Sequence, residues 1–278
     1  FIHSFIHKME QLRGLNPKRI TNKNDLEIQI IDWNVSTIDM AVNEDSSGSG
    51  SGSSDEDSNN KNEQKKKDER FLIRAYGNTI KGTSVTINIS GFPPHCYVSI
   101  PETWTDAKIG MLIKNVKERM SYYSKTEIIN YDVVMRKKFW GFTNNKQYVF
   151  LRILFKNTYA MRSTEKVLNG NLSFPGRKSQ VYEVYESNIP PLLRFFHIKQ
   201  IKPVGWIKLN RGKFQHNISK NTRCQIDCTM NYNDVEPVNL DKIGKFVVAS
   251  YDIECTSCDG TFPNATRKED EIIQIGKK

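Results

Sequence analysis

The sequence predicts an α+β fold, in which short strands are interspersed with a few helices. Two observations support this prediction. Segments with alternating apolar and polar residues, typical of half-buried strands, recur along most of the chain, and several are separated by turn residues as in hairpins. Helical periodicity is confined to a few segments. Because strands and helices do not alternate regularly, a doubly wound parallel sheet is not expected. With 278 residues, of which 37% are hydrophobic, the chain can form one large domain or two ordinary ones.

The first third of the chain predicts a sheet with a long insertion. Residues 25–40 alternate as a strand or two short strands, and 71–77 and 84–90 form a hairpin around a turn-like segment. Between them, residues 43–70 contain no large apolar side chain and are rich in Ser, Gly and charge. Such a segment cannot offset its ordering entropy, so we expect a disordered insertion within the sheet. Residues 91–101 contain consecutive prolines, which predict an extended corner before a short strand.

The remaining segments contain both helices and strands. The strongest helix covers residues 106–124, with Asp106 as its N-cap and one apolar face. That face carries Ile109, Leu112, Ile113, Val116 and Met120. Two more helices are predicted at 158–170, ending at Asn169 and Gly170, and at 190–197. Strands are predicted at 147–155, 204–209, 223–230 and 245–254.

Positive charge is concentrated in the middle of the chain. The net charge is +10, but residues 136–223 alone carry 18 Lys/Arg against three Glu, a surplus of 15. Aromatic residues are interleaved with this charge, as in surfaces that neutralise phosphates and stack bases. They are Phe139, Trp140, Phe142, Tyr148, Phe150, Phe155, Tyr159, Phe195 and Phe196. An ordinary solvated surface over an aromatic core explains the composition equally well.

Several features narrow the class of protein. No apolar run is long enough to cross a bilayer and the first residues do not resemble a signal peptide, so we expect a soluble intracellular protein without membrane contact. Five cysteines without a regular framework favour reduced thiols over a zinc site. A start at Phe1 and an end in two lysines suggest a fragment.

The segment KFVVASYDIE carries the most informative pattern. An apolar run at 246–249, typical of a strand covered on both faces, leads to Asp252 and Glu254. Side chains two apart on a strand point to the same side, so the two carboxylates should lie close together. Oxygen ligands suit Mg²⁺ or Mn²⁺, and two such ions about 4 Å apart can act on a phosphodiester. Alone, the D-x-E pattern is weak, since exposed strands often carry it.

The wider context of these carboxylates resembles a known family. SYDIECTS, the following GTFP and then EIIQIG are similar to the first exonuclease motif of family B DNA polymerases, particularly the delta-like and large DNA virus enzymes. YESNIPPLLRFFHIKQIKPVGWIKL and RKKFWGFTNNKQYVFLRILFKN resemble segments that precede this motif, and FLIRAYGNTIKGTSVTINISGFPPHCYVSIP resembles their amino-terminal sheet. The final Lys277 and Lys278 depart from the family pattern and suggest that native sequence ends near Gly276.

The resemblance implies a mixed N-terminal domain over residues 1–243, followed at 244–278 by the first strands of an RNase H-like 3′-5′ exonuclease domain. It implies that Asp252 and Glu254 are catalytic residues that bind two Mg²⁺ or Mn²⁺ ions, and that Phe262 contacts unpaired DNA. The later exonuclease motifs and the polymerase aspartates are absent.

The implied parent is therefore a DNA polymerase with a proofreading exonuclease. Its partners would be primer-template DNA, a single-stranded 3′ end, deoxynucleoside triphosphates and a sliding-clamp processivity factor. A viral enzyme would work in the host cytoplasm, a virus factory or the nucleus. A stand-alone 3′-5′ exonuclease and a non-catalytic single-strand binding module remain alternatives.

Overall fold

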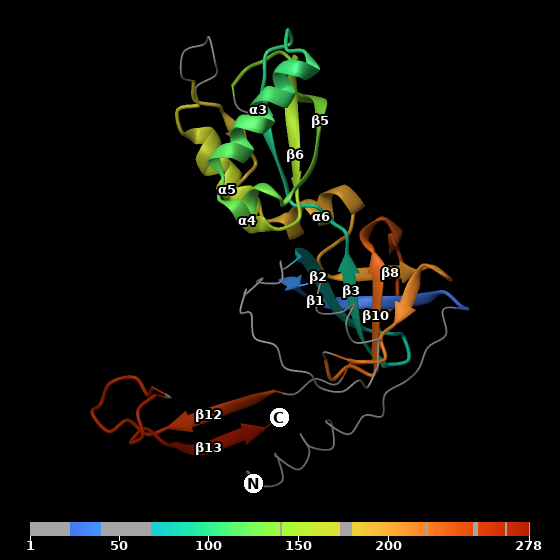
Figure 1. Ribbon diagram of the computed structural model, residues 1–278. Helices are drawn as coiled ribbons and strands as arrows, with labels where there is room; N and C mark the ends of the chain where they lie inside the picture. Colours follow the sequence, from blue (N-terminus) through green and yellow to red (C-terminus); the bar gives the residue numbers. More distant parts are fainter. Residues whose placement is uncertain are drawn as a thin grey trace, which may run out of the picture.

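The computed structural model describes residues 23–39, 68–139, 141–172, 180–220, 222–246, 250–264 and 266–277. The described residues form a seven-stranded sheet, a four-stranded sheet with helices on one face, and a separate two-stranded hairpin (Figure 1). In chain order the elements are β1 (Leu26–Asp39), β2 (Glu69–Asn78), β3 (Ser84–Ser90), β4 (His95–Ser99), α3 (Asp106–Arg119), α4 (Tyr122–Lys125), β5 (Ile128–Lys137), β6 (Gln147–Phe155), α5 (Thr158–Asn169), β7 (Val184–Tyr185), α6 (Pro191–Lys199), β8 (Gly205–Leu209), β9 (Phe214–His216), β10 (Ile226–Asn231), the 3₁₀ turn η2 (Tyr232–Asp234), β11 (Val235–Val238), β12 (Tyr251–Cys255) and β13 (Ile272–Lys277). This mixed α+β architecture confirms the predicted fold class.

The seven-stranded sheet has the strand order β11-β8-β1-β2-β3-β10-β9. The predicted hairpin of β2 and β3 is confirmed, and β1 pairs with β2 on the other side, so the long insertion interrupts a sheet as expected. Most of the insertion lies outside the described residues. Its predicted end at 70 is wrong, because Glu69 and Arg70 already pair with Asp39 and Ile38 across the β1–β2 ladder.

The core of this sheet consists of alternating aliphatic residues and α6. Phe195 and Phe196 of α6 pack into the core, and Trp33 of β1 meets their rings edge to face at centroid distances of 5.8 and 5.0 Å. Gly77 of β2 lies close to the backbone of β1. A Cβ atom there would lie 2.2 Å from the backbone oxygen of Gln29, so only glycine fits.

The four-stranded sheet has the order β5-β6-β4-β7, and the proline corner leads the chain into it as predicted. Helices α3 and α5 cover one face, where their apolar residues form a second core with β4 and β6 (Figure 1). Strand β6 and helix α5 match the predicted ranges, and α5 ends at Asn169 with Gly170 as its C-cap. Strand β5 was not predicted.

The helix predicted over 106–124 is interrupted. Its apolar face is buried as expected, but Met120 takes an extended backbone conformation and ends α3 at Arg119. A short helix, α4, follows after Ser121, whose side chain accepts a hydrogen bond from the Ser124 N–H. The predicted N-cap is also wrong by one residue, because Thr105 occupies that position and Asp106 lies in the first turn.

Strands β12 and β13 form an antiparallel hairpin at the carboxyl end of the chain. Residues 247–249 of the strand predicted at 245–254 lie outside the described residues, and Phe246 is not in a strand. The described strand begins only at Tyr251, and Ile253, Ile272 and Ile273 are exposed. The predicted pattern of a covered strand that ends at the carboxylates is therefore not present in the described part.

Over the described ranges, no helix is long and apolar enough to cross a membrane.

Candidate metal and nucleic-acid sites

Strand β12 carries the two carboxylates that the sequence singled out. Asp252 is paired with Gly276 of β13 and Glu254 with Gln274, so both lie at alternate positions of a regular ladder and share one side of the hairpin. Both residues are exposed. One oxygen of Asp252 accepts a hydrogen bond of 2.9 Å from the Ile253 N–H, which fixes the orientation of its carboxylate.

The carboxylate pair has a donor set that fits a hard divalent cation. Within the described ranges, neither Asp252 nor Glu254 forms an ion pair with a basic side chain, so their negative charge is not neutralised by the protein. Carboxylate oxygens are the ligands preferred by Mg²⁺ and Mn²⁺. The described part of the chain brings no third acidic, His or Cys side chain to the pair. A complete metal site would therefore need ligands in addition to these two carboxylates.

The connection between β12 and β13 is organised by charged groups. Arg267 forms ion pairs with Asp259 and with Asp270, the latter through its Nε at 2.8 Å. One Asp270 oxygen accepts the Asn264 N–H at 2.7 Å and the other accepts the Cys258 N–H at 3.2 Å. The hydrogen bond from Asn264 lowers the pKa of Asp270 below its ordinary value. We call Arg267, Asp259 and Asp270 the loop clasp.

Phe262 lies in this connection with its side chain 93% exposed. Its backbone oxygen accepts a hydrogen bond of 2.7 Å from Arg267, so the loop clasp also holds the backbone that carries the ring. When the backbone is already held in place, an exposed aromatic ring can contact a ligand with little loss of conformational entropy. The predicted DNA contact is therefore sterically accessible.

All five cysteines are free thiols. Cys96 and Cys228 are buried, and burial raises the pKa of each thiol to about 12, so both remain protonated at neutral pH. The pairs Cys255–Cys258 and Cys224–Cys228 join no metal-ligand cluster within the described ranges. The sequence-based preference for structural thiols over zinc stays a prediction.

The aromatic residues of the basic middle section do not form one surface. Phe150, Phe155, Phe195 and Phe196 are buried in the two cores, so for these residues the alternative interpretation, an aromatic core, is confirmed. These residues lie on the apolar faces of β6 and α6, and that position in the sequence pattern is the signal of their burial. By contrast, the side chains of Phe139, Phe142 and Tyr159 are 102%, 97% and 67% exposed. Trp140 lies outside the described residues.

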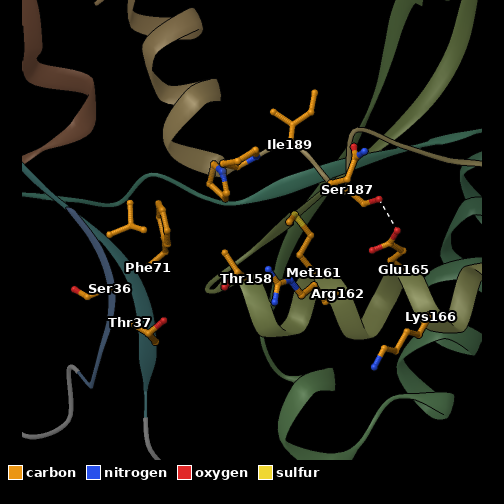
Figure 2. A pocket seen from close by; sticks show the side chains of 14 residues that line it. Ser36, Thr37, Phe71, Thr158, Met161, Arg162, Glu165, Lys166, Ser187 and Ile189 are labelled. Atoms are coloured by element: carbon orange, nitrogen blue, oxygen red, sulfur yellow. Dashed lines mark hydrogen bonds between the residues drawn. The ribbon is translucent and has the colours of Figure 1, made fainter. Parts of the chain in front are cut away.

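A crevice between the two sheets was not predicted from the sequence. It has a volume of about 800 Å³ and lies between β1, β2, α5 and the segment before α6. Arg162 and Lys166 of α5 line it one helical turn apart, and Glu165 accepts a hydrogen bond of 2.7 Å from Ser187 (Figure 2). Sequence could not reveal the crevice, because it forms between segments far apart in the chain.

Comparison with known proteins places these features in a family. Residues 182–277, which include the carboxylate pair and the loop clasp, match the model of the exonuclease domain of DNA polymerase family B. A DNA polymerase of Acanthamoeba polyphaga mimivirus is 33% identical over 224 residues, which cover 76% of this chain and 13% of that protein. The chain belongs to the family B DNA polymerases. The predicted resemblance is thereby confirmed.

Cellular and archaeal members of family B are also similar. The DNA polymerase delta catalytic subunit of Arabidopsis thaliana is 28% identical over 213 residues, covering 73% of this chain and 19% of the relative. The fold resembles the solved family B DNA polymerase of Pyrobaculum calidifontis with a TM-score of 0.56 and 16% identity, covering 91% of this chain and 25% of that one. The chain thus spans between an eighth and a quarter of the length of these family B proteins.

Proposed function

We propose that this chain is part of a DNA-directed DNA polymerase that proofreads with a 3′-5′ exonuclease, and that Asp252 and Glu254 belong to the exonuclease site. One observation carries the proposal. The two carboxylates lie on one side of β12, exposed and without a basic partner among the described residues, inside the region that matches the exonuclease family model.

In this proposal Asp252 and Glu254 hold two Mg²⁺ or Mn²⁺ ions. Bound ions of this kind lower the pKa of a water molecule and stabilise the charge that develops on the phosphate. Asp252 and Glu254 would hold the ions through their carboxylate oxygens, and Glu254 would also orient the attacking water. The hydrogen bond from Ile253 keeps one Asp252 oxygen in place while the other remains available.

Phe262 would contact the unpaired 3′ end of the primer. The aromatic ring can stack on a base of any sequence, which suits an enzyme that removes whichever nucleotide is mispaired. The loop clasp holds the backbone of Phe262 and leaves its ring exposed, which supports this role. Arg267 would then act as a positioning residue rather than as a DNA ligand.

We infer the domain boundary from the sheets. Strands β8 to β11 pair within the same sheet as β1 to β3, whereas among the described strands β12 and β13 pair only with each other. This supports an N-terminal domain over residues 1–243 and the start of the exonuclease domain at 244–278. The complete enzyme would bind primer-template DNA and deoxynucleoside triphosphates inside the cell, and a sliding clamp is a further expected partner.

The direct experiment uses the full-length enzyme that contains this chain. We expect Asp252→Ala and Glu254→Ala each to reduce excision of a mispaired primer end by at least a hundredfold, with normal extension of a paired primer. Glu269→Ala is the matched control, because Glu269 is exposed in the same hairpin connection. Unchanged excision in both active-site variants would refute the assignment.

The two alternative functions make different predictions. A stand-alone exonuclease would excise primer ends without extending them, and a binding module would do neither. The similar proteins named above are DNA polymerases or a polymerase catalytic subunit, which favours the first proposal. We also expect the 278-residue chain alone to show neither activity, because two carboxylates form only part of a metal site.

A further inference from the structure

Strand β5 forms one edge of the four-stranded sheet. It pairs with β6 on one side, and no described strand pairs with its other side (Figure 1). Such an edge presents unpaired N–H and C=O groups, which proteins usually protect with Pro, Lys or a β-bulge. The register of β5 shifts only between Ile128 and Asn130, and residues 131–135 contain neither Pro nor Lys. This central part of β5 is therefore open to pairing with another strand.

Three apolar side chains follow the open part of β5. Tyr131, Val133 and Met135 occupy alternate positions and are 37%, 49% and 45% exposed. Tyr131 is paired with Ile153 and Val133 with Leu151, and both partners are buried in the core beneath the helices. Paired residues share a face of the sheet, so the three side chains lie on the helix-covered face, at an edge where they remain partly exposed. We call Tyr131, Val133 and Met135 the edge stripe.

A groove of about 360 Å³ lies between α3 and β5. Gly110 and Ile113 of α3 and Tyr131 of the edge stripe line it. A Cβ atom at Gly110 would meet nothing within 4 Å. Glycine destabilises the interior of a helix relative to alanine, and no described neighbour of Gly110 requires its small size. The position therefore suits close approach of another polypeptide to the helix.

The groove is positively charged. The residues that line it include three lysines and one acidic residue, namely Lys114, Lys117, Lys125 and Glu118. Glu118 lies 3.9 Å from Lys114, whereas Lys117 forms no ion pair with a carboxylate in the described ranges. Asp132 of β5 does not offset this charge, because it lies on the other face of the sheet and forms an ion pair of 2.7 Å with β6. An occupant with negative charge would complement the groove.

We propose that the edge stripe and this groove bind an extended, acidic segment of a partner protein, which adds to the sheet as a further strand beside β5. Its backbone would pair with the free N–H and C=O groups of residues 131–135. Alternate apolar side chains of the segment would cover the edge stripe and enter the groove beside Gly110. Its acidic side chains would contact Lys114 and Lys117.

Other occupants fit this surface less well. A second copy of this chain, paired through β5, would bring two α3 helices with the same lysines to one face of the joined sheet, where their charges repel. A nucleic acid would satisfy the lysines but offers no backbone amides to pair with β5. The groove and the carboxylate pair lie in different sheets, so the inference does not rest on the proposed exonuclease function.

The test measures binding of a fluorescein-labelled peptide to the 278-residue chain by anisotropy. Valine alternates with glutamate in the peptide, which has the length of β5. We expect saturable binding and new protection of the amides of residues 131–135 from hydrogen exchange. One comparison peptide has its valines in a single block, and another has lysine in place of glutamate. Both should bind more weakly than the alternating peptide by about tenfold or more.

Variants of the chain separate the contributions to binding. Gly110→Leu fills the groove but keeps a good helix former, and it should weaken binding about tenfold or more. Tyr131→Ala with Val133→Ala removes apolar contacts and should have an effect of about the same size. Lys114→Gln with Lys117→Gln should weaken binding mainly at low salt, because added salt screens the charge of the lysines.

Matched controls lie on α5. Tyr159→Ala removes an exposed ring and Lys166→Gln an exposed cation, and both should bind the alternating peptide as the unmodified chain does. Asp252→Asn with Glu254→Gln should also leave the affinity unchanged, so this test and the excision assay can fail separately. Circular dichroism spectra of all variants should match that of the unmodified chain, because none of the substituted residues is buried.

Several outcomes would overturn the proposal. The alternating peptide could show no saturable binding at millimolar concentration, or the peptide with its valines in one block could bind as tightly. Gly110→Leu could leave the affinity unchanged. An oligodeoxyuridine strand that displaces the peptide at equal charge concentration would identify a nucleic-acid site. A dimer in sedimentation that Val133→Lys dissociates would identify a second copy of the chain as the occupant.

Discussion

His95 is a buried titratable group at the junction between the two sheets, and its replacement gives a quantitative test of the packing. It begins β4, is 4% exposed, and its Nδ1 lies 3.0 Å from the Pro93 carbonyl oxygen. Burial lowers its pKa from 6.5 to about 4, and the positive charge of Arg194 acts in the same direction. The folded protein therefore holds a neutral imidazole between pH 4 and 6.5.

The pKa shift fixes how stability depends on pH. Because the folded pKa is depressed, the unfolded chain binds more protons than the folded one in this range, and the free energy of unfolding falls as pH falls. The contribution of His95 is complete above pH 6.5 and is lost as the pH drops toward 4. Between pH 7 and pH 5 this single group should cost about 2 kcal/mol of stability.

The assay is urea unfolding at pH 7 and at pH 5, for the unmodified chain and for His95→Gln. Glutamine keeps a donor for the Pro93 oxygen but does not titrate. The variant is expected to lose about 2 kcal/mol less than the unmodified chain between the two pH values, whatever its absolute stability. Equal losses in both proteins would show that His95 is not held neutral by burial, and the reasoning would be refuted.

Three further predictions concern single sites. Gly77→Ala should lower the free energy of unfolding in urea by about 3 kcal/mol or more, because the added Cβ would meet the Gln29 backbone. Gly110→Ala in α3 should instead raise it by up to about 1 kcal/mol, because a Cβ there meets nothing within 4 Å. Asn157→Ala removes the side-chain cap of α5 and should cost about 1 to 2 kcal/mol by the same measurement, and no loss would exclude the cap. The depressed pKa of Asp270 predicts that amide protection in the loop clasp is present above pH 3.8 and is lost as the pH falls through the lowered pKa. Hydrogen exchange in which acid titration of Asp270 leaves this protection unchanged would contradict the prediction.

Strands with clear alternation and turn boundaries could be predicted from the sequence. The β2–β3 hairpin, β6 and helix α5 match because local pattern and tertiary packing agree there. Strand β5 was missed because its alternate residues are mostly exposed at a sheet edge, which weakens the apolar signal. The end of helix α3 before Met120 was also missed, because no Gly or Pro marks it in the sequence. Tertiary packing overrides the local helix preference there.

The candidate sites also differ in whether local sequence pattern or tertiary structure determines them. The carboxylates of β12 were found because a spacing of two on a strand has one geometric meaning. The loop clasp was missed because it joins residues of an irregular connection whose pairing depends on the path of the backbone. For the aromatic residues of the basic section, composition alone could not separate the exposed Phe139 from the buried Phe150. That distinction requires knowing which face of the sheet the helices cover.

Binding of Mn²⁺ to the 278-residue chain tests the role of the carboxylate pair most directly. In NMR spectra, bound Mn²⁺ broadens the amide signals of nearby residues. We predict that broadening is centred on Asp252 and Glu254, and that Asp252→Asn with Glu254→Gln abolishes it. Broadening that persists in this double variant, or that centres on Asp259 and Asp270, would contradict the assignment of the pair as metal ligands.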